Sequence, residues 1–323
     1  MCIRDRIPIS NPTLGSGLVL GGAYFYRQTE AQKKVQPPSV TGAAGLYTDN
    51  DSYVVGIGHQ SYWAENKWRL SGALAHADLK LRLETQLPDR TALFDWKIKG
   101  NVALLKLARE LGGNWYLGGF FRGIDADQEF GVSIPVLQDD LLDTSTREVG
   151  LGLYTEYDNR DKPMNTYTGN IFEADILFNS DKFGGDSSYQ SFSVNYRSSH
   201  SLSESLVLAW ELKGCARSKQ TPLWDACTVS LRGFNATRYL GERSASGQAE
   251  LRWRFFRKFG AVAFAGAGNY ENLATNLIDR DVVKSYGGGL RYMLLESQRI
   301  NLRVDYARSG GSDAVYLSVG EAF

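Results

Sequence analysis

Apolar and polar residues alternate along most of this chain, and this period of two limits the possible folds more than any other feature. In the segment 299–308, one parity carries the apolar side chains Ile300, Leu302, Val304 and Tyr306. The other parity carries the polar side chains Arg299, Asn301, Arg303 and Asp305. Successive side chains of a β-strand point to opposite faces of a sheet, so this pattern predicts strands with one apolar and one polar face. The segments 189–197, 248–255 and 286–294 repeat the pattern, and we therefore expect an all-β fold.

The alternating segments predict sixteen strands. Fifteen of these strands are expected at residues 15–27, 39–48, 52–63, 67–80, 93–107, 114–125, 146–157, 166–179, 188–198, 204–213, 244–256, 259–269, 283–295, 298–308 and 313–323. A truncated first strand at Ile7–Ser10 supplies the sixteenth, because bacterial single-chain membrane barrels contain an even number of strands. Long connections, which alternate with short ones, are expected at 81–92, 126–145, 180–187, 214–243 and 270–282. The connection 28–38 would lie on the periplasmic side of such a barrel, where short turns are expected, and it is longer than a turn.

Two classes of protein share this pattern: soluble β-proteins with an apolar core, and membrane barrels with an apolar outer face. The mean hydropathy of −0.30 is ordinary for a soluble protein, but the strands of a membrane barrel are apolar on one face only. So many strands enclose an interior too wide for side chains to fill, and the polar faces are therefore expected to line a wet lumen. Aromatic residues that suit interfacial girdles gather near strand ends, at Tyr24, Tyr26, Tyr62, Trp63, Trp68, Trp115 and Tyr116. The sequence thus predicts a single transmembrane antiparallel up-and-down β-barrel in contact with outer-membrane lipids and lipopolysaccharide.

The charge balance and the short apolar runs argue against a nucleic-acid partner and against membrane-spanning helices. The 36 basic residues balance the 36 acidic residues, so no net positive field favours nucleic acid as a partner. The apolar run Val102–Leu105 ends at Lys106, far short of the ~18 residues that a membrane-spanning helix needs. Residues 1–6 are polar, lack the apolar centre of a signal peptide and are interpreted as non-native, which leaves 7–323 as one barrel domain.

Four segments carry a resemblance to a known family. They are Gly150–Asp161 (GLGLYTEYDNRD) with the following Thr168-Gly169, Leu231–Phe234 (LRGF), Gly247–Trp253 (GQAELRW) and Ser318–Phe323 (SVGEAF). In order and spacing they resemble the barrel domain of BamA-like outer-membrane assembly and translocation proteins, the bacterial surface antigen family, without its amino-terminal POTRA modules. The resemblance implies that Phe323 ends a carboxy-terminal signal for insertion into the outer membrane of a Gram-negative bacterium.

The resemblance also implies a latch inside the barrel. The loop that contains Arg232 would fold into the lumen, where acidic groups of the inner wall hold the guanidinium by charge-assisted hydrogen bonds. Glu250 matches the first acidic partner that the family pattern implies, whereas Gly266 stands where the family usually has aspartate, so a weaker or differently paired latch is expected. Gly233 would permit a close approach of the backbone, and Phe234, after Leu231-Arg232-Gly233, would pack on the wall. A solvated loop arginine is the alternative.

Protein insertion or translocation is the function that the resemblance implies. Unfolded outer-membrane protein clients would pair their free strand edges at the seam between the first and last strands, because lipid tolerates no open edge. A passive pore or structural barrel, with the loop as a plug of the lumen, is the alternative function.

Cysteine and histidine positions address the remaining chemistry. Cys215 and Cys227 lie 12 positions apart (227 − 215) in a loop expected outside the cell, and in an oxidising compartment this predicts a disulfide rather than free thiols or a metal site. His59, His76 and His200 lie apart, without cysteine or histidine at ligand spacing. No nucleophile or nucleotide-binding motif was found, so we expect no enzyme, no cofactor and no metal site.

Overall fold

A computed structural model gives the fold. It describes residues 2–87, 90–131, 140–233, 235, 237–272, 282–296, 299–309 and 312–323. The chain divides into two compact units, each described here by itself. The first contains residues 1–7, 14–155 and 175–190, and the second contains 8–13, 156–174 and 191–323.

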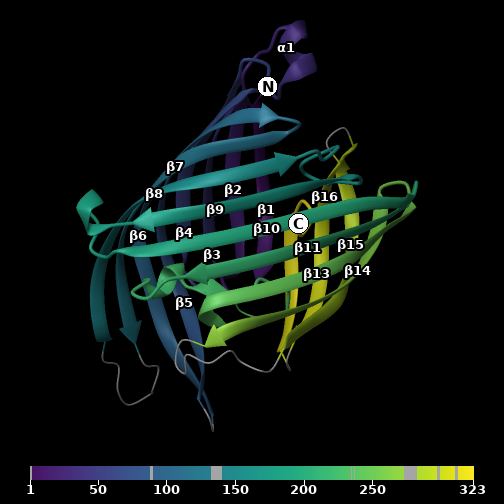
Figure 1. The fold of residues 1–323 in the computed structure, drawn as a ribbon. Coiled ribbons are helices and arrows are strands. Elements are labelled where there is room, and N and C mark those ends of the chain that lie inside the picture. The colour runs from purple at the N-terminus through teal and green to yellow at the C-terminus, as the bar shows by residue number, and fades with distance from the viewer. Residues whose placement is uncertain are drawn as a thin grey trace. The chain divides into compact units, whose positions relative to one another are not determined.

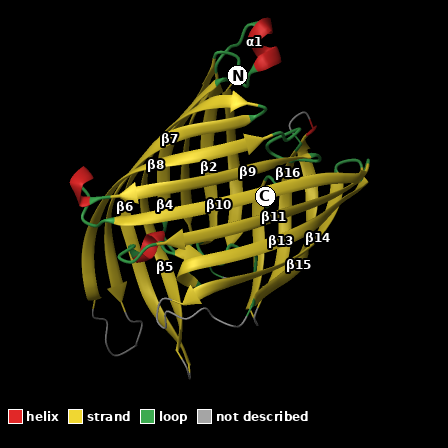
Figure 2. Cartoon of the chain, viewed as in Figure 1, coloured by secondary structure: helices red, strands yellow, loops and turns green. Residues whose placement is uncertain are grey.

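The fold is all-β, a closed antiparallel barrel of 16 strands with one additional short strand. Closure follows from the pairing of β1 (Cys2–Asn11) with both β2 (Gly15–Phe25) and β17 (Ser312–Val319). The additional strand, β12 (Cys227–Thr228), pairs with β13 (Leu240–Phe256). Strands dominate both units, and helical segments are few and short (Figure 2). The predicted fold class is confirmed.

The other strands follow one another along the chain (Figure 1). They are β3 (Val40–Thr48), β4 (Tyr53–Trp63), β5 (Trp68–Leu87), β6 (Arg90–Gly112), β7 (Trp115–Gly131), β8 (Asp140–Asp158), β9 (Gly169–Asn179), β10 (Tyr189–Ser203), β11 (Leu206–Arg217), β14 (Phe259–Asn272), β15 (Val283–Leu295) and β16 (Ile300–Ser309). Each strand pair whose register is defined is antiparallel, as in β16 and β17, where Val304 lies opposite Leu317.

The two faces of the sheet differ as the alternation predicts. The large apolar side chains of one face are exposed, and Leu74 in the first unit and Leu290 in the second have exposures of 60% and 64%. The opposite face of the second unit carries buried charged side chains, among them Glu250 and Asp305. Lipid covers the outer face of a membrane barrel and favours apolar side chains there, so the face with Leu74 and Leu290 is the outer face. We call the face with Glu250 and Asp305 the inner face.

Several strands are longer than the sequence pattern predicts, among them β5 to β8. The pairing of β5 with β6 continues from Asp78 opposite Lys99 to Leu87 opposite Arg90, and β7 and β8 likewise include much of the connection expected at 126–145. Charged side chains pair across these strands, for example Lys97 of β6 and Glu129 of β7 at 2.8 Å. In β5 the alternation itself continues beyond residue 80, with Leu81 and Leu83 between Lys80, Arg82 and Glu84, so the pattern is that of the longer strand.

The long connection after β2 contains the helix α1 (Glu30–Val35). A capping box begins it: the Thr29 hydroxyl accepts a hydrogen bond from the Gln32 backbone, and the Gln32 side chain accepts one from the Thr29 backbone. After the helix, the Gln36 side-chain amide donates a 3.0 Å hydrogen bond to the Tyr62 carbonyl. These bonds give the unexpected length of this connection a structural explanation.

Candidate functional site

A disulfide opens the connection between β11 and β13. Cys215 and Cys227 are bonded, with their Cα atoms 5.7 Å apart, and the predicted disulfide is confirmed. Cys215 lies on β11, and Cys227 belongs to the short β12, where it pairs with Gly241. The disulfide and β12 together fix the start of the segment that follows.

The segment 229–233, which we call the loop segment, packs on the inner face of the second unit. Val229 and Leu231 form a buried cluster with Tyr270 of β14. Two glycines of β14 make room for them: a Cβ on Gly268 would lie 2.6 Å from Val229 Cγ1, and a Cβ on Gly266 would lie 2.8 Å from Leu231 Cδ2. The loop segment thus packs into the space that the two glycines of β14 leave on the inner face.

Arg232 lies at the centre of this contact and is 7% exposed. Its Nη1 atom is 2.7 Å from Glu250 Oε2 on β13 and 2.9 Å from Asp305 Oδ2 on β16. Its guanidinium carbon lies 3.4 Å from the centre of the Phe264 ring, a cation–π distance. This environment differs from that of a solvated loop arginine.

Asp305 supplies the second carboxylate, rather than position 266. The Leu231 side chain occupies the space that an aspartate at position 266 would need. The pairing therefore differs from the family pattern by moving the acidic group from β14 to β16. We refer to Arg232, Glu250 and Asp305 as the latch.

Gly233 has a backbone φ of 115°, a conformation that side-chain-bearing residues rarely adopt. Its N–H donates a 2.8 Å hydrogen bond to the Tyr316 hydroxyl of β17, and a Cβ would lie 3.0 Å from Ser309 Cβ. The Ser285 hydroxyl donates to the Arg232 carbonyl. The expected position of Phe234 lies outside the described residues.

The connection between β8 and β9, which belongs to the second unit, makes a charged contact within that unit. Asp161 pairs with Arg299, whose guanidinium carbon also lies 4.0 Å from the centre of the Tyr167 ring. Partial burial raises the pKa of Asp161, but the Arg299 hydrogen bond and the backbone N–H groups of Tyr167 and Thr168 outweigh it, so the pKa is lowered.

The three histidines do not share a cluster. His59 and His76 each bond a neighbouring strand, whereas the His200 ring lies 2.8 Å from the Ser198 hydroxyl, which also contacts Asn170 at 2.6 Å. A serine beside a histidine is one element of a nucleophile site. Ser198 is only 2% exposed, however, so its hydroxyl does not face a space that a substrate could enter.

Comparison with known proteins settles the family. The Omp85 superfamily domain model matches residues 8–323. The chain belongs to the Omp85 superfamily. Barrels of this superfamily lie in the outer membrane of Gram-negative bacteria, and this chain is an outer-membrane protein of that kind. No curated protein matches the chain.

Solved structures share the fold of this Omp85 barrel at low identity. BamA from Haemophilus ducreyi lacking POTRA domains 1–3 is 13% identical with a TM-score of 0.67, and the match covers 99% of this chain and 70% of that one. CdiB from Acinetobacter baumannii is 12% identical (TM-score 0.64, 99% and 59% covered), and CdiB from Escherichia coli is 10% identical (0.69, 98% and 62%). The chain thus spans about three fifths of each CdiB chain.

No helix among the described residues of this Omp85 barrel is long and apolar enough to cross a membrane. No group of three or more histidine, cysteine, aspartate or glutamate side chains in that part of the chain could hold a metal ion.

Proposed function

We propose that this Omp85 barrel inserts or translocates proteins at the outer membrane, with unfolded outer-membrane proteins as clients. The observation that carries the proposal is the burial of Arg232 between Glu250 and Asp305, at 2.7 and 2.9 Å. A guanidinium held by two carboxylates fixes a loop in a defined place, while its hydrogen bonds remain exchangeable. Such a contact suits a protein that alternates between a closed and an open state.

The junction of β1 and β17 is where a client would act in this proposal. Ser10 of β1 lies opposite Leu317 of β17. Parting these strands exposes an edge of backbone N–H and C=O groups, which lipid cannot satisfy but an incoming strand can. A client would therefore enter the membrane by pairing with this edge.

The second candidate is a passive pore or structural barrel that the loop segment plugs. Its support is that the loop segment holds Arg232 against Glu250 and Asp305 of the inner face, as it would if the loop merely blocked a wet lumen. We propose no enzymatic role, because the Ser198 hydroxyl beside His200 is buried.

One pair of measurements separates these functions. The purified chain is placed in liposomes with a urea-unfolded eight-stranded outer-membrane barrel, whose insertion is followed by heat-modifiable gel migration, and in planar bilayers to record current. We expect insertion above that of protein-free liposomes, and a severalfold loss in Arg232→Ala.

Arg243→Ala is the matched control, because this β13 arginine is exposed and only loosely paired with Glu271 at 3.6 Å. It should leave insertion unchanged. Insertion no faster than in empty liposomes, together with a steady current that Arg232→Ala does not alter, would favour the pore.

A further inference from the structure

Arg232 belongs to a ring of buried charged side chains in which positive and negative groups alternate. The ring members, in order, are Arg232, Glu250, Arg252, Glu321, Arg291 and Asp305. They come from the loop segment, from β13, β15 and β16, and from the residues that follow β17. Parts of the chain that are remote in sequence therefore meet in one electrostatic cluster.

The half of the ring that contains the latch is closely spaced. Glu250 lies 2.7 Å from Arg232 through one carboxylate oxygen and 2.7 Å from Arg252 through the other. Asp305 lies 2.9 Å from Arg232 and 2.5 Å from Arg291. Each carboxylate thus bridges two arginines, and neither arginine pair can move without disturbing the carboxylate between them.

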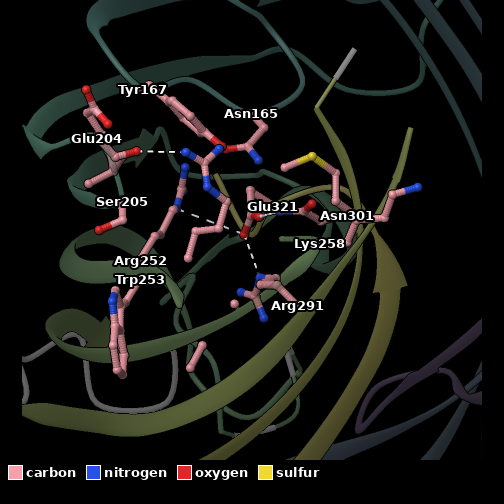
Figure 3. A pocket seen from close by; sticks show the side chains of 15 residues that line it. Asn165, Tyr167, Glu204, Ser205, Arg252, Trp253, Lys258, Arg291, Asn301 and Glu321 are labelled. Atoms are coloured by element: carbon pink, nitrogen blue, oxygen red, sulfur yellow. Dashed lines mark hydrogen bonds and ion pairs between the residues drawn. The ribbon is translucent and has the colours of Figure 1, made fainter. Parts of the chain in front are cut away.

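Glu321 completes the ring by its contacts with Arg291 and Arg252 (Figure 3). Its Oε2 atom lies 2.8 Å from Arg291 Nε and 4.0 Å from Arg252 Nε, the longest contact of the six. Its Oε1 atom accepts a 2.6 Å hydrogen bond from the Asn301 side chain. The Glu321 side chain is only 2% exposed, so it shares the low-dielectric environment of the latch.

A turn at the end of β17 brings Glu321 to this place. The last strand ends at Val319, and Gly320 follows with φ of 98°, a left-handed conformation that suits glycine. Its N–H still bonds the Asn301 carbonyl of β16 at 2.7 Å. Beyond it, the Phe323 carbonyl accepts a 2.8 Å hydrogen bond from Arg252 of β13. Residues 320–323, which we call the tail, therefore cross the inner face from β16 to β13.

Shared charge partners make the ring act as a unit. Three arginines face three buried carboxylates within the ring, and a fourth arginine, Arg303, lies beside it at 3.7 Å from Asp305 Oδ2. Removing one partner of a buried pair leaves an uncompensated charge, which is strongly unfavourable. Release of Arg232 removes one close partner from both Glu250 and Asp305. Their other close partners, Arg252 at 2.7 Å and Arg291 at 2.5 Å, are the two arginines that hold the tail.

We propose that Glu321 and Arg252 are positioning residues that couple the loop segment to the tail. When the loop segment leaves the inner face, the tail is loosened, and when the tail leaves, the loop segment is loosened. Because the tail continues β17, this coupling links the latch to the strand at the β1–β17 junction. The importance of the coupling for client entry rests on the proposed function, whereas the coupling itself does not.

Coupling between two sites is reciprocal, and hydrogen–deuterium exchange of the full chain in lipid nanodiscs measures both directions. Glu321 does not touch the loop segment. In Glu321→Gln the amides of that segment should nevertheless exchange at least about fivefold faster, which is the lower end of the range of coupling factors between two sites. In Arg232→Gln, the amides of the tail should accelerate by a similar factor. The double variant should show less than the product of the two effects.

Three further variants test the route of the coupling. Glu173→Gln breaks a 2.8 Å ion pair with Arg197 in the same unit but outside the ring, and should change neither segment. Tyr316→Phe removes the direct hydrogen bond from the loop segment to β17 and should leave tail exchange nearly unchanged. If Glu321→Gln fails to fold, Asn301→Ala removes one hydrogen bond of Glu321, keeps every charge, and should show the same reciprocal effect at smaller size.

Each outcome bears on the proposal. The proposal is wrong if each substitution speeds amide exchange only in the segment that carries it, or if Glu173→Gln speeds exchange as much as the ring variants do. It is also wrong if exchange in the tail rises in Tyr316→Phe but not in Arg232→Gln. Amide exchange is measured without a client. If both reciprocal increases in exchange occur in a protein that inserts no client, the coupling is supported and the proposed function is rejected.

Discussion

Leu231 and Gly266 share one space on the inner face: a Cβ on Gly266 would lie 2.8 Å from Leu231 Cδ2 and 2.9 Å from Gln248 Cβ. The loop leucine and a side chain at position 266 therefore exclude each other. The latch obtains its second carboxylate from Asp305, which does not compete with Leu231 for this volume. Gly266 thus both leaves room for Leu231 and leaves position 266 without a carboxylate, so that Asp305 is the second acidic partner of Arg232.

Gly266→Asp should displace the loop segment. Overpacking of a filled site is unfavourable by about 1–3 kcal/mol, and here the added group is also charged. We expect a lower free energy of unfolding in urea titrations of the protein in lipid vesicles, and faster proteolysis after Arg232. Adding Leu231→Ala should recover part of the loss. A Gly266→Asp protein as stable as the parent chain would show that the space is not shared.

Asp305→Asn should be among the most destabilising substitutions of β16. It deprives both Arg232 and Arg291 of a buried partner, and breaking such a pair is unfavourable by about 3–5 kcal/mol. Asp313→Asn is the matched control, since its pair with Arg308 is 3.6 Å long and more than half exposed, and it should change stability by less than about 1 kcal/mol. Equal effects of the two substitutions in urea titrations would contradict the account.

Removal of the disulfide should loosen the loop segment without unfolding the strands. The Cys215–Cys227 disulfide closes a short loop, and loop-closure entropy assigns it ~3 kcal/mol. In Cys215→Ser/Cys227→Ser we expect faster amide exchange at 229–233 and unchanged exchange in β15 and β16. Unchanged protection of the loop segment would mean that the latch alone orders it.

The connection between β8 and β9 should lose stability in acid. The pKa of Asp161 is lowered in the folded chain, so its contribution is present above the ordinary aspartate pKa and is lost as the pH falls through the lowered value. Asp161→Asn should therefore melt below the parent chain at neutral pH, and the two should converge in acid. A difference in melting temperature that is independent of pH would argue against ionised Asp161 as the cause.

Strands with one apolar face could be predicted from the sequence because lipid imposes the alternation on every span. The predicted end of β5 was too early although Leu81 and Leu83 continue the alternation past residue 80, whereas the polar run 125–129 of β7 resembles a loop. The helix α1 was overlooked although its signal was present, since Thr29 and Gln32 have the spacing of a capping box.

The candidate site was only partly predictable. Arg232 and Glu250 were named through the family resemblance, and the structure brings their charged groups to 2.7 Å. Asp305 was not assigned to Arg232, because 73 positions separate them and their contact depends on how the loop segment packs on the inner face. The role of Glu321 was not predicted for a similar reason. It depends on the turn at Gly320, whereas the alternating pattern predicts a strand that continues to Phe323.

The central claim, that clients enter at the β1–β17 junction, is tested most directly by locking that junction. Ser10→Cys/Leu317→Cys, in a chain with Cys2→Ser, joins β1 to β17 at directly opposed positions. Val304→Cys/Leu317→Cys is the matched control, which uses the same β17 residue to join it to β16. Both pairs are oxidised, and the insertion of a urea-unfolded eight-stranded barrel into liposomes is measured before and after reduction. We predict that oxidised Ser10→Cys/Leu317→Cys loses insertion and regains it on reduction while the control stays active throughout; equal insertion by both oxidised proteins would contradict the claim.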